Sequence, residues 1–146
     1  MRAVLQRVSS ASCEVDGIIT GSCQRGLMIL CGVAAGDTAA DAEALALKIS
    51  KLRIFEDGAG KMNLSVQDIG GEVLAVSQFT LLGDARKGKR PSFIEAARPE
   101  IADPLYEKVV ENIRAAGLTC KTGVFRADMQ VELINDGPVN ILYDTR

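Results

Sequence analysis

Polar side chains follow an apolar run in the middle of the chain. Residues 72–76 are mostly aliphatic, and Ser77, Gln78 and Thr80 come next, around the aromatic Phe79. An aliphatic run that opens with two glycines is typical of a buried strand. Polar groups at the end of such a strand need hydrogen-bond partners or a ligand. The segment therefore predicts either a satisfied strand end or one wall of a binding site.

The next segment is basic. One carboxylate, that of Asp84, is set against four cations: Arg86, Lys87, Lys89 and Arg90. Cations beside a hydroxyl, an amide and an aromatic ring favour a pocket for an anionic ligand. A solvated loop without a ligand is the simpler interpretation, and these residues alone leave both open.

The composition excludes several catalytic mechanisms. The 146 residues include no histidine, which removes Ser-His-Asp and Cys-His nucleophiles, histidine-ligated zinc and histidine acid–base catalysis. The four cysteines form no C-x-x-C pair, so we expect reduced thiols rather than disulfides or a zinc site. No metal and no cofactor is expected.

Charge and length restrict the partners and the compartment. A formal net charge of −2 argues against a broadly basic surface, so any contact with nucleic acid would be local. No apolar run approaches the roughly 20 residues of a membrane-spanning helix, and the N-terminal segment is charged too early for a signal peptide. We expect a cytoplasmic protein with a single domain, residues 1–146, and no membrane segment.

Periodicity and turn signals predict the elements that position these residues. Alternation predicts strands at 3–8 and 12–15, followed by a hairpin turn at 16–17. Residues 26–33 are apolar on both faces, which is typical of a central strand. A helix is expected after an N-cap at Thr38.

The second half is predicted to contain helices and then strands. A short helix is expected over 91–95, ended by Pro99, and a longer helix from 103–104 to Gly117. Three strands follow, at 119–125, 129–134 and 139–143. This order predicts a layered α/β domain with mixed or antiparallel sheets. Two good helices cannot cover so many strands, so a second sheet or a second subunit is expected to cover the rest.

A second group of residues lies near the two ends of the chain. Gly137-Pro138 separates two predicted strands, where a tight turn is the plain interpretation. A proline there also permits a cis peptide bond, which would aim the preceding carbonyl in an unusual direction. Arg7 is a cation on an otherwise apolar strand and could brace such a turn.

Six short segments together resemble one protein family. They are Gln6-Arg7-Val8, Lys61-Met62-Asn63, Ser77-Gln78-Phe79-Thr80-Leu81, Arg90-Pro91-Ser92-Phe93, Ala127-Asp128-Met129 and Asn135-Asp136-Gly137-Pro138-Val139. Each is weak alone, but in this order they resemble the D-aminoacyl-tRNA deacylase family over essentially the whole chain. The resemblance implies a three-layer α/β/β domain, barrel-like, with mixed or antiparallel sheets, that works as a homodimer.

The resemblance also implies an activity. Members of this family hydrolyse the ester that joins a D-amino acid, and in many members glycine, to the 3′-terminal adenosine of tRNA. The chain is thus expected to be an ester hydrolase of translation quality control that binds aminoacyl-tRNA, releases the free D-amino acid and rejects L-aminoacyl substrates. Glycyl-tRNA mischarged on tRNA(Ala) is an expected further substrate.

Roles for individual residues follow from the resemblance. Gly137-Pro138 is implied to be cis and to reach into the partner's pocket, where its main chain holds the substrate's amine and excludes an L side chain. Arg7 is implied to fix this turn, and Phe125 and Met129 to line the adenosine slot. The implied catalytic wall consists of Ser77, Gln78, Phe79 and Thr80.

Two routes to hydrolysis remain for a protein without histidine. Thr80 could act as the nucleophile, although nothing in the sequence offers it a base. Alternatively, the ribose 2′-OH of the substrate orients a water, and backbone N–H groups near Phe79 and Thr80 stabilise the oxyanion. We favour the second route. The basic segment from Arg86 to Arg90 is expected to contact acceptor-stem phosphates without reading their sequence.

One position departs from the family, and two rival functions are open. The family commonly has threonine after Gly-Pro-Val, where this chain has Asn140, so substrate preference is less firmly implied than the reaction. One rival is an RNA-end-binding dimer without catalysis. The other is an amidase for small D-amino compounds, in which Ser77 or Thr80 would need a lysine base such as Lys61. Neither rival accounts for Gly137-Pro138 together with Arg7.

Overall fold

The first strand is longer than the sequence predicts. In the computed structural model, which describes residues 1–146, β1 (Arg2–Val15) is one continuous strand rather than two strands at 3–8 and 12–15. The small residues between the predicted strands stay extended because Ser10 and Ala11 pair with the C-terminal strand. The hairpin turn at 16–17 is confirmed and leads into β2 (Ile18–Cys23).

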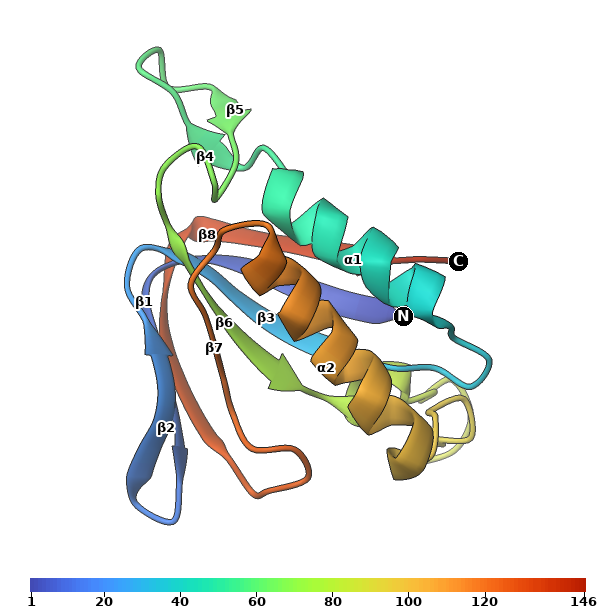
Figure 1. Cartoon of the computed structure of the whole chain (residues 1–146). Coiled ribbons are helices and arrows are strands. Elements are labelled where there is room, and N and C mark those ends of the chain that lie inside the picture. The colour runs from blue at the N-terminus through green and yellow to red at the C-terminus, as the bar shows by residue number, and fades with distance from the viewer.

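The main sheet is mixed, as predicted. Its order is β2-β1-β3-β6-β7, and β8 (Gln130–Asp144) pairs with the other side of β1. β3 (Gly26–Gly32) is the expected central strand, and it runs parallel to β6 (Glu72–Ser77), which in turn runs parallel to β7 (Cys120–Thr122). β7 covers only the start of the strand predicted at 119–125. β4 (Phe55–Glu56) and β5 (Met62–Leu64) form a separate two-stranded arm that projects from the body (Figure 1).

The curvature of the main sheet creates two cores. On one face, Leu5 and Ile29 pack with residues of both helices in a cluster of 22 buried residues. On the other face, Val8 and Cys13 of β1 close over Leu74 in a cluster of seven buried residues. The sheet therefore bends back on itself and is nearly closed, so the barrel-like prediction is confirmed. The cover for the second face comes from this same sheet rather than from a separate one.

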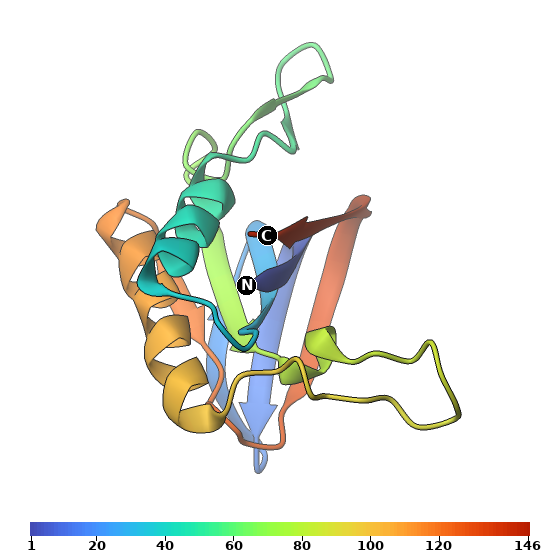
Figure 2. The same ribbon diagram turned by 90° about the vertical axis from the view of Figure 1, so that its right-hand side faces the viewer.

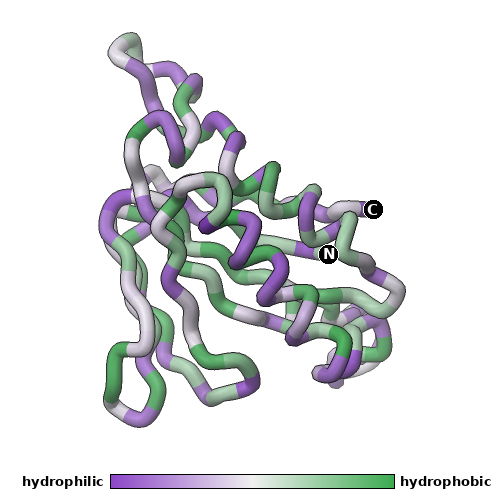
Figure 3. The backbone as a smooth tube through the Cα atoms, in the orientation of Figure 1, coloured by the Kyte–Doolittle hydropathy of each residue, from purple (hydrophilic) through white to green (hydrophobic).

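Two helices cover the open face of the sheet side by side (Figures 1 and 2). Hydrophobic residues follow the strands beneath them, whereas hydrophobic and hydrophilic stretches alternate along both helices (Figure 3). α1 (Ala39–Lys51) begins after the predicted Thr38 cap, whose backbone N–H donates to Asp41 at 2.9 Å. Neither helix is long and apolar enough to span a membrane.

The start of the second helix was predicted wrongly. α2 (Pro99–Ala115) begins at Pro99 and contains Pro104, whereas the sequence predicted an end at the first proline and a start at the second. Proline suits the first helical position because its missing N–H has no partner there anyway. The predicted helix over 91–95 is absent, because Ser92 forms a bridge with Asp84 instead. The predicted end is confirmed, with Gly117 at a φ of 87°.

Gly137-Pro138 does not form a turn between two strands. β8 passes through it as one strand, and β1 pairs Gln6 with Asn140 but Val8 with Asn135. Residues 136–139 therefore bulge out opposite Arg7. We call these four residues the β8 bulge.

Candidate functional site

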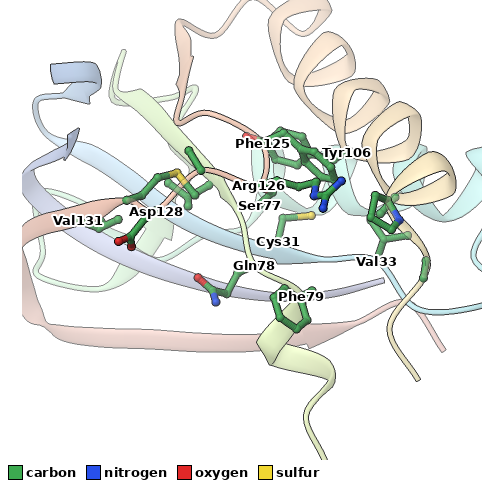
Figure 4. A pocket seen from close by; sticks show the side chains of 16 residues that line it. Cys31, Val33, Ser77, Gln78, Phe79, Tyr106, Phe125, Arg126, Asp128 and Val131 are labelled. Atoms are coloured by element: carbon green, nitrogen blue, oxygen red, sulfur yellow. The ribbon is translucent and has the colours of Figure 1, made fainter. Parts of the chain in front are cut away.

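A cavity of about 550 Å³ opens where β6 ends. Its walls come from the end of β6, the first turns of α2 and the loop between β7 and β8 (Figure 4), and 11 of its 16 lining residues are hydrophobic. This volume lies in the range of small-molecule sites, which are mostly apolar with a few polar groups. Three of the predicted wall residues line it: Ser77, Gln78 and Phe79.

The polar wall forms because the strand changes into a short helix. The Gln78 N–H donates to the Cys31 carbonyl at 2.8 Å, and the 3₁₀ helix η1 (Phe79–Leu82) starts at the next residue. The first N–H groups of a helix have no partner within it, and those of Phe79 and Thr80 occupy this position. The cavity edge therefore presents backbone donors of the kind that stabilise an oxyanion.

The Thr80 side chain has only one polar partner. Its hydroxyl accepts a hydrogen bond from the Gln78 amide, and no carboxylate or lysine bonds to it. Thr80 is exposed and does not line the cavity, although its neighbours do. The structure thus gives this hydroxyl no base.

An aromatic slot forms the far side of the cavity. Phe125 and Met129, the two residues that the resemblance places beside an adenosine, both line it, and Tyr106 lies beside Phe125 with ring centroids 6.3 Å apart (Figure 4). Tyr106 donates its hydroxyl to the Ala75 carbonyl at 2.9 Å, and burial raises its pKa, so it stays neutral. The sequence analysis missed Tyr106 and Arg126. The only sequence signal for Tyr106 was an aromatic residue on the core face of α2, and no sequence pattern marked Arg126, whose φ is 64°.

The β8 bulge is held by a buried cation. Arg7, a residue only 6% exposed, donates from Nε to the Asp136 carbonyl and from Nη1 to the Ile54 carbonyl, each at 2.8 Å. The Gly137-Pro138 peptide bond is cis, and both residues are exposed.

The Asn135 side chain closes the β8 bulge. Its oxygen accepts from the Val139 N–H at 2.7 Å, and its amide donates to the Asn140 side chain at 2.8 Å. Asn140, which stands where the family commonly has threonine, is thus part of the hydrogen bonds that close the bulge.

Comparisons with known proteins identify the family. Residues 4–144 match the model of the family described as D-Tyr-tRNA(Tyr) deacylase. The chain belongs to this family. As a member, it is a hydrolase that acts on ester bonds.

Individual relatives span nearly the whole chain. The D-aminoacyl-tRNA deacylase of Anaeromyxobacter dehalogenans is 64% identical over 146 residues, which are 100% of this chain and 98% of the relative. A solved structure titled c-Myc DNA Unwinding Element Binding Protein has a TM-score of 0.92 and 41% identity over 99% of this chain and 98% of its own. A structure titled "Structural Analysis of a probable eukaryotic D-amino acid tRNA deacylase" has a TM-score of 0.85 at 16% identity, covers 97% of each chain, and shows the fold alone.

Apart from Thr80, which lies on η1 and does not line the cavity, the residues predicted for this deacylase-family site lie in three places. The cavity collects five of them: Ser77, Gln78, Phe79, Phe125 and Met129. Arg7, Gly137 and Pro138 lie at the β8 bulge, and none of the three lines the cavity. The basic residues lie on a loop that projects from the body (Figure 2).

The cations of the basic loop are not equivalent. Arg86 is paired with Asp84, with Nη2 and Oδ2 2.7 Å apart, and this contact holds the pKa of the Asp84 carboxyl well below its usual range. Lys87, Lys89 and Arg90 are exposed and make no ion pair. Their charges are available to an anionic ligand.

One of the four cysteines lies at the cavity. All four cysteines are free thiols, as predicted. Cys31 lines the cavity, but burial raises its pKa to about 12, which keeps it protonated. No group of three or more His, Cys, Asp or Glu side chains is placed to hold a metal ion.

Proposed function

We propose that this protein hydrolyses the ester bond of D-aminoacyl-tRNA. The observation that carries the proposal is the cavity, which joins an aromatic slot at Phe125 to the wall at Phe79, where η1 begins with backbone N–H groups that have no partner within the helix. An adenosine fits an apolar slot with a few polar contacts, and the adjacent N–H groups suit the developing oxyanion of an ester. Relatives at 64% identity carry the name D-aminoacyl-tRNA deacylase.

The chemical step uses water and the substrate's own hydroxyl. Water adds to the ester carbonyl carbon, and the Phe79 and Thr80 N–H groups hold the oxyanion. The carbon–oxygen bond to the ribose then breaks. The proton from the water passes through the 2′-OH to the departing 3′ oxygen, which leaves a free amino acid and tRNA. The absence of a base beside Thr80 supports this route over attack by its hydroxyl.

The complete site is formed by two copies of this single domain, residues 1–146. Two observations support this part of the proposal. Gly137-Pro138 is exposed and lies outside the cavity of its own chain. β8 is an edge strand, paired only with β1, and carries Leu142 at 78% exposure. In a homodimer, the β8 bulge of one subunit enters the cavity of the other and excludes an L side chain by rigid backbone.

Chirality and metal dependence are tested in one experiment. Release of amino acid is measured from matched D- and L-aminoacyl-tRNA, and from glycyl-tRNA(Ala), with EDTA present. Rapid release from the D form but not from the L form is expected. Equal binding of D and L forms without release would contradict the proposal and favour the rival RNA-end-binding dimer.

The role of Thr80 is tested separately. Thr80→Ala is expected to keep activity within about tenfold of wild type, since it leaves the backbone N–H in place. A substrate with 2′-deoxyadenosine at its end is expected to react at least 100-fold more slowly, an estimate for a lost positioning group. Inactivity of a folded Thr80→Ala protein would instead assign the nucleophile to the hydroxyl.

A further inference from the structure

Two aromatic rings lie exposed at the mouth of the cavity. Phe79 is 57% exposed and Phe93 is 37% exposed, and their ring centroids are 5.1 Å apart with planes at 68°. The chain has only four phenylalanines, and two of them meet on the surface rather than in a core. An edge-to-face pair leaves ring faces free. Packing within one chain does not explain this pair, so both rings are free to meet another molecule.

The backbone fixes the position of this aromatic pair. Phe79 is the first residue of η1, at the cavity wall. Phe93 follows Ser92, which exchanges two backbone hydrogen bonds with Asp84 at 2.8 and 2.9 Å. Gly83 allows the close approach, since a Cβ there would lie 2.9 Å from Cε1 of Phe93. The pair is therefore preformed and does not depend on the conformation of the loop tip.

The aromatic pair lies between the cavity and the basic loop. Phe79 contributes to the cavity, Phe93 contacts Phe79, and the unpaired cations Lys87, Lys89 and Arg90 precede Phe93 along the loop. The loop projects away from the body (Figure 2). Aromatic rings followed by cations are the combination that binds single-stranded nucleic acid, because bases stack on the rings and phosphates meet the cations.

We propose that the Phe79–Phe93 pair is a stacking site for the nucleobase next to the terminal adenosine of a tRNA. The inference rests on the proposed function, in which the adenosine itself occupies the cavity. The RNA strand leaves the cavity over the aromatic pair, and its phosphates then reach the basic loop. Stacking accepts any base, so this site adds affinity for the single-stranded RNA end without selecting a tRNA.

The first test measures binding without catalysis. The probe is a short single-stranded RNA that ends in adenosine and carries fluorescent 2-aminopurine as its penultimate base. We expect wild-type protein to quench the fluorescence on binding. Phe93→Leu should weaken binding about tenfold, within the range for loss of one stacked base, and should remove the quenching. Phe93→Tyr should retain both because it keeps the ring.

A matched control separates stacking from loss of apolar surface. Ile94 is the next residue, is 85% exposed and has no ring. Ile94→Ala should leave affinity and quenching unchanged. Phe93→Leu protein with wild-type affinity and quenching would overturn the inference, as would a Phe93→Leu effect confined to self-association measured by sedimentation.

The second test separates the inference from the proposed function. Phe93→Leu should lower kcat/KM for D-aminoacyl-tRNA about tenfold and leave kcat/KM for D-aminoacyl-adenosine unchanged, since the latter has no second base. Equal losses on both substrates would show a structural role and overturn the stacking site. Absence of hydrolysis by the wild-type protein would contradict the proposed function, while the 2-aminopurine result would still report on stacking.

Discussion

The β8 bulge and the basic loop are both exposed, yet the protein holds them in opposite ways. The buried guanidinium of Arg7 donates to the Asp136 carbonyl of the bulge, and the Asn135 side chain accepts from the Val139 N–H across it. The basic loop is closed at its base by two backbone hydrogen bonds between Asp84 and Ser92. Beyond that base, Arg86 bonds back to Asp84, and the tip of the loop has no such restraint.

This difference matches what each region is proposed to do. Excluding an L side chain needs backbone that cannot move, because a flexible wall would yield to the wrong substrate. Attracting phosphates needs charge but little geometry, because the interaction acts over about 10 Å in salt solution. Changes that disturb backbone should therefore be costly in the bulge and tolerated in the loop.

The largest effect is expected from Gly137→Ala. Gly137 has a φ of 143°, and a Cβ there would lie 2.6 Å from Cγ2 of Val139 and 2.8 Å from its backbone nitrogen. The bulge would have to shift, and misplacement of a positioning group by about 1 Å can lower a rate about 100-fold. We expect a loss of that size in release of D-amino acid by a folded protein, measured beside its circular dichroism spectrum.

The basic loop supplies the matched control for that substitution. Gly88 also has a positive φ, 71°, but a Cβ there would meet nothing within 4 Å. Gly88→Ala should change deacylation less than about threefold, since such strain alone costs roughly 1 kcal/mol. Similar losses from both glycines would contradict the contrast between the two regions.

Mixed dimers would show whether the bulge acts across subunits. Gly137→Ala and Phe125→Ala proteins should each be inactive, but co-expression should restore about a quarter of wild-type activity. Random pairing makes half of the dimers mixed, and each mixed dimer has one intact site of two in a symmetric homodimer. Failure to recover any activity from folded mixed dimers would place both groups in the same subunit.

Arg7→Lys should have the next largest effect. A guanidinium reaches two carbonyls at once, whereas an ammonium is a single point that leaves one of them unpaired. Because Arg7 is buried, we expect about 2 kcal/mol less stability in urea unfolding and impaired deacylation. Arg114→Lys is the control, because both its hydrogen bonds go to one carbonyl, that of Cys120, and it lies away from the bulge. It should leave activity unchanged, and equal effects on activity would refute a specific role for Arg7.

Local sequence signals correctly predicted those features of the fold that depend on one short segment of the chain. The Thr38 cap, the turn at 16–17 and Gly117 each act through one or two backbone groups, and all three were confirmed. Errors arose where a distant strand decides. Ser10 stays extended because β8 pairs with it, and Gly137-Pro138 remains within a strand because β1 continues on both sides of it.

Part of the cavity lining was predictable from the sequence, but its arrangement was not. Hydroxyl, amide and aromatic residues after an aliphatic run indicated the wall at 77–79, which the cavity now contains. Tyr106 was missed because an aromatic on a helix core face is ordinarily packing, and only the tertiary structure turns it toward a cavity. No local pattern could reveal that Asp84 neutralises Arg86, because that depends on the conformation of the loop.

Removing charge from the basic loop should change affinity without disturbing structure. Lys87→Ala/Lys89→Ala protein should bind tRNA more weakly, and the dependence of log Kd on log salt should become shallower by about 0.9 for each phosphate that the loop no longer neutralises. Thermal stability should stay within about 0.5 kcal/mol of wild type because both side chains are exposed. An unchanged salt dependence would mean that the loop is simply solvated.

The smallest effect, and the most specific, is expected from Asp84→Asn. This change keeps the backbone bridge to Ser92 but releases Arg86 to meet a phosphate, so tRNA affinity should rise about threefold at low salt and return to wild type at high salt. Glu111→Gln, an exposed change of equal charge on α2, is the control and should have no such effect.

The pH dependence of this effect follows from the pKa of Asp84, which lies below the usual aspartate pKa. The carboxyl is ionised, and its ion pair with Arg86 is formed, at every pH above the usual aspartate pKa. The pair is lost only when the pH falls through the lowered pKa. The difference between Asp84→Asn and wild type should therefore stay constant from pH 8 to pH 5. If it vanished within that interval, the Arg86 pair would not be what restrains the loop's charge, and the contrast with the buried Arg7 would have to rest on backbone alone.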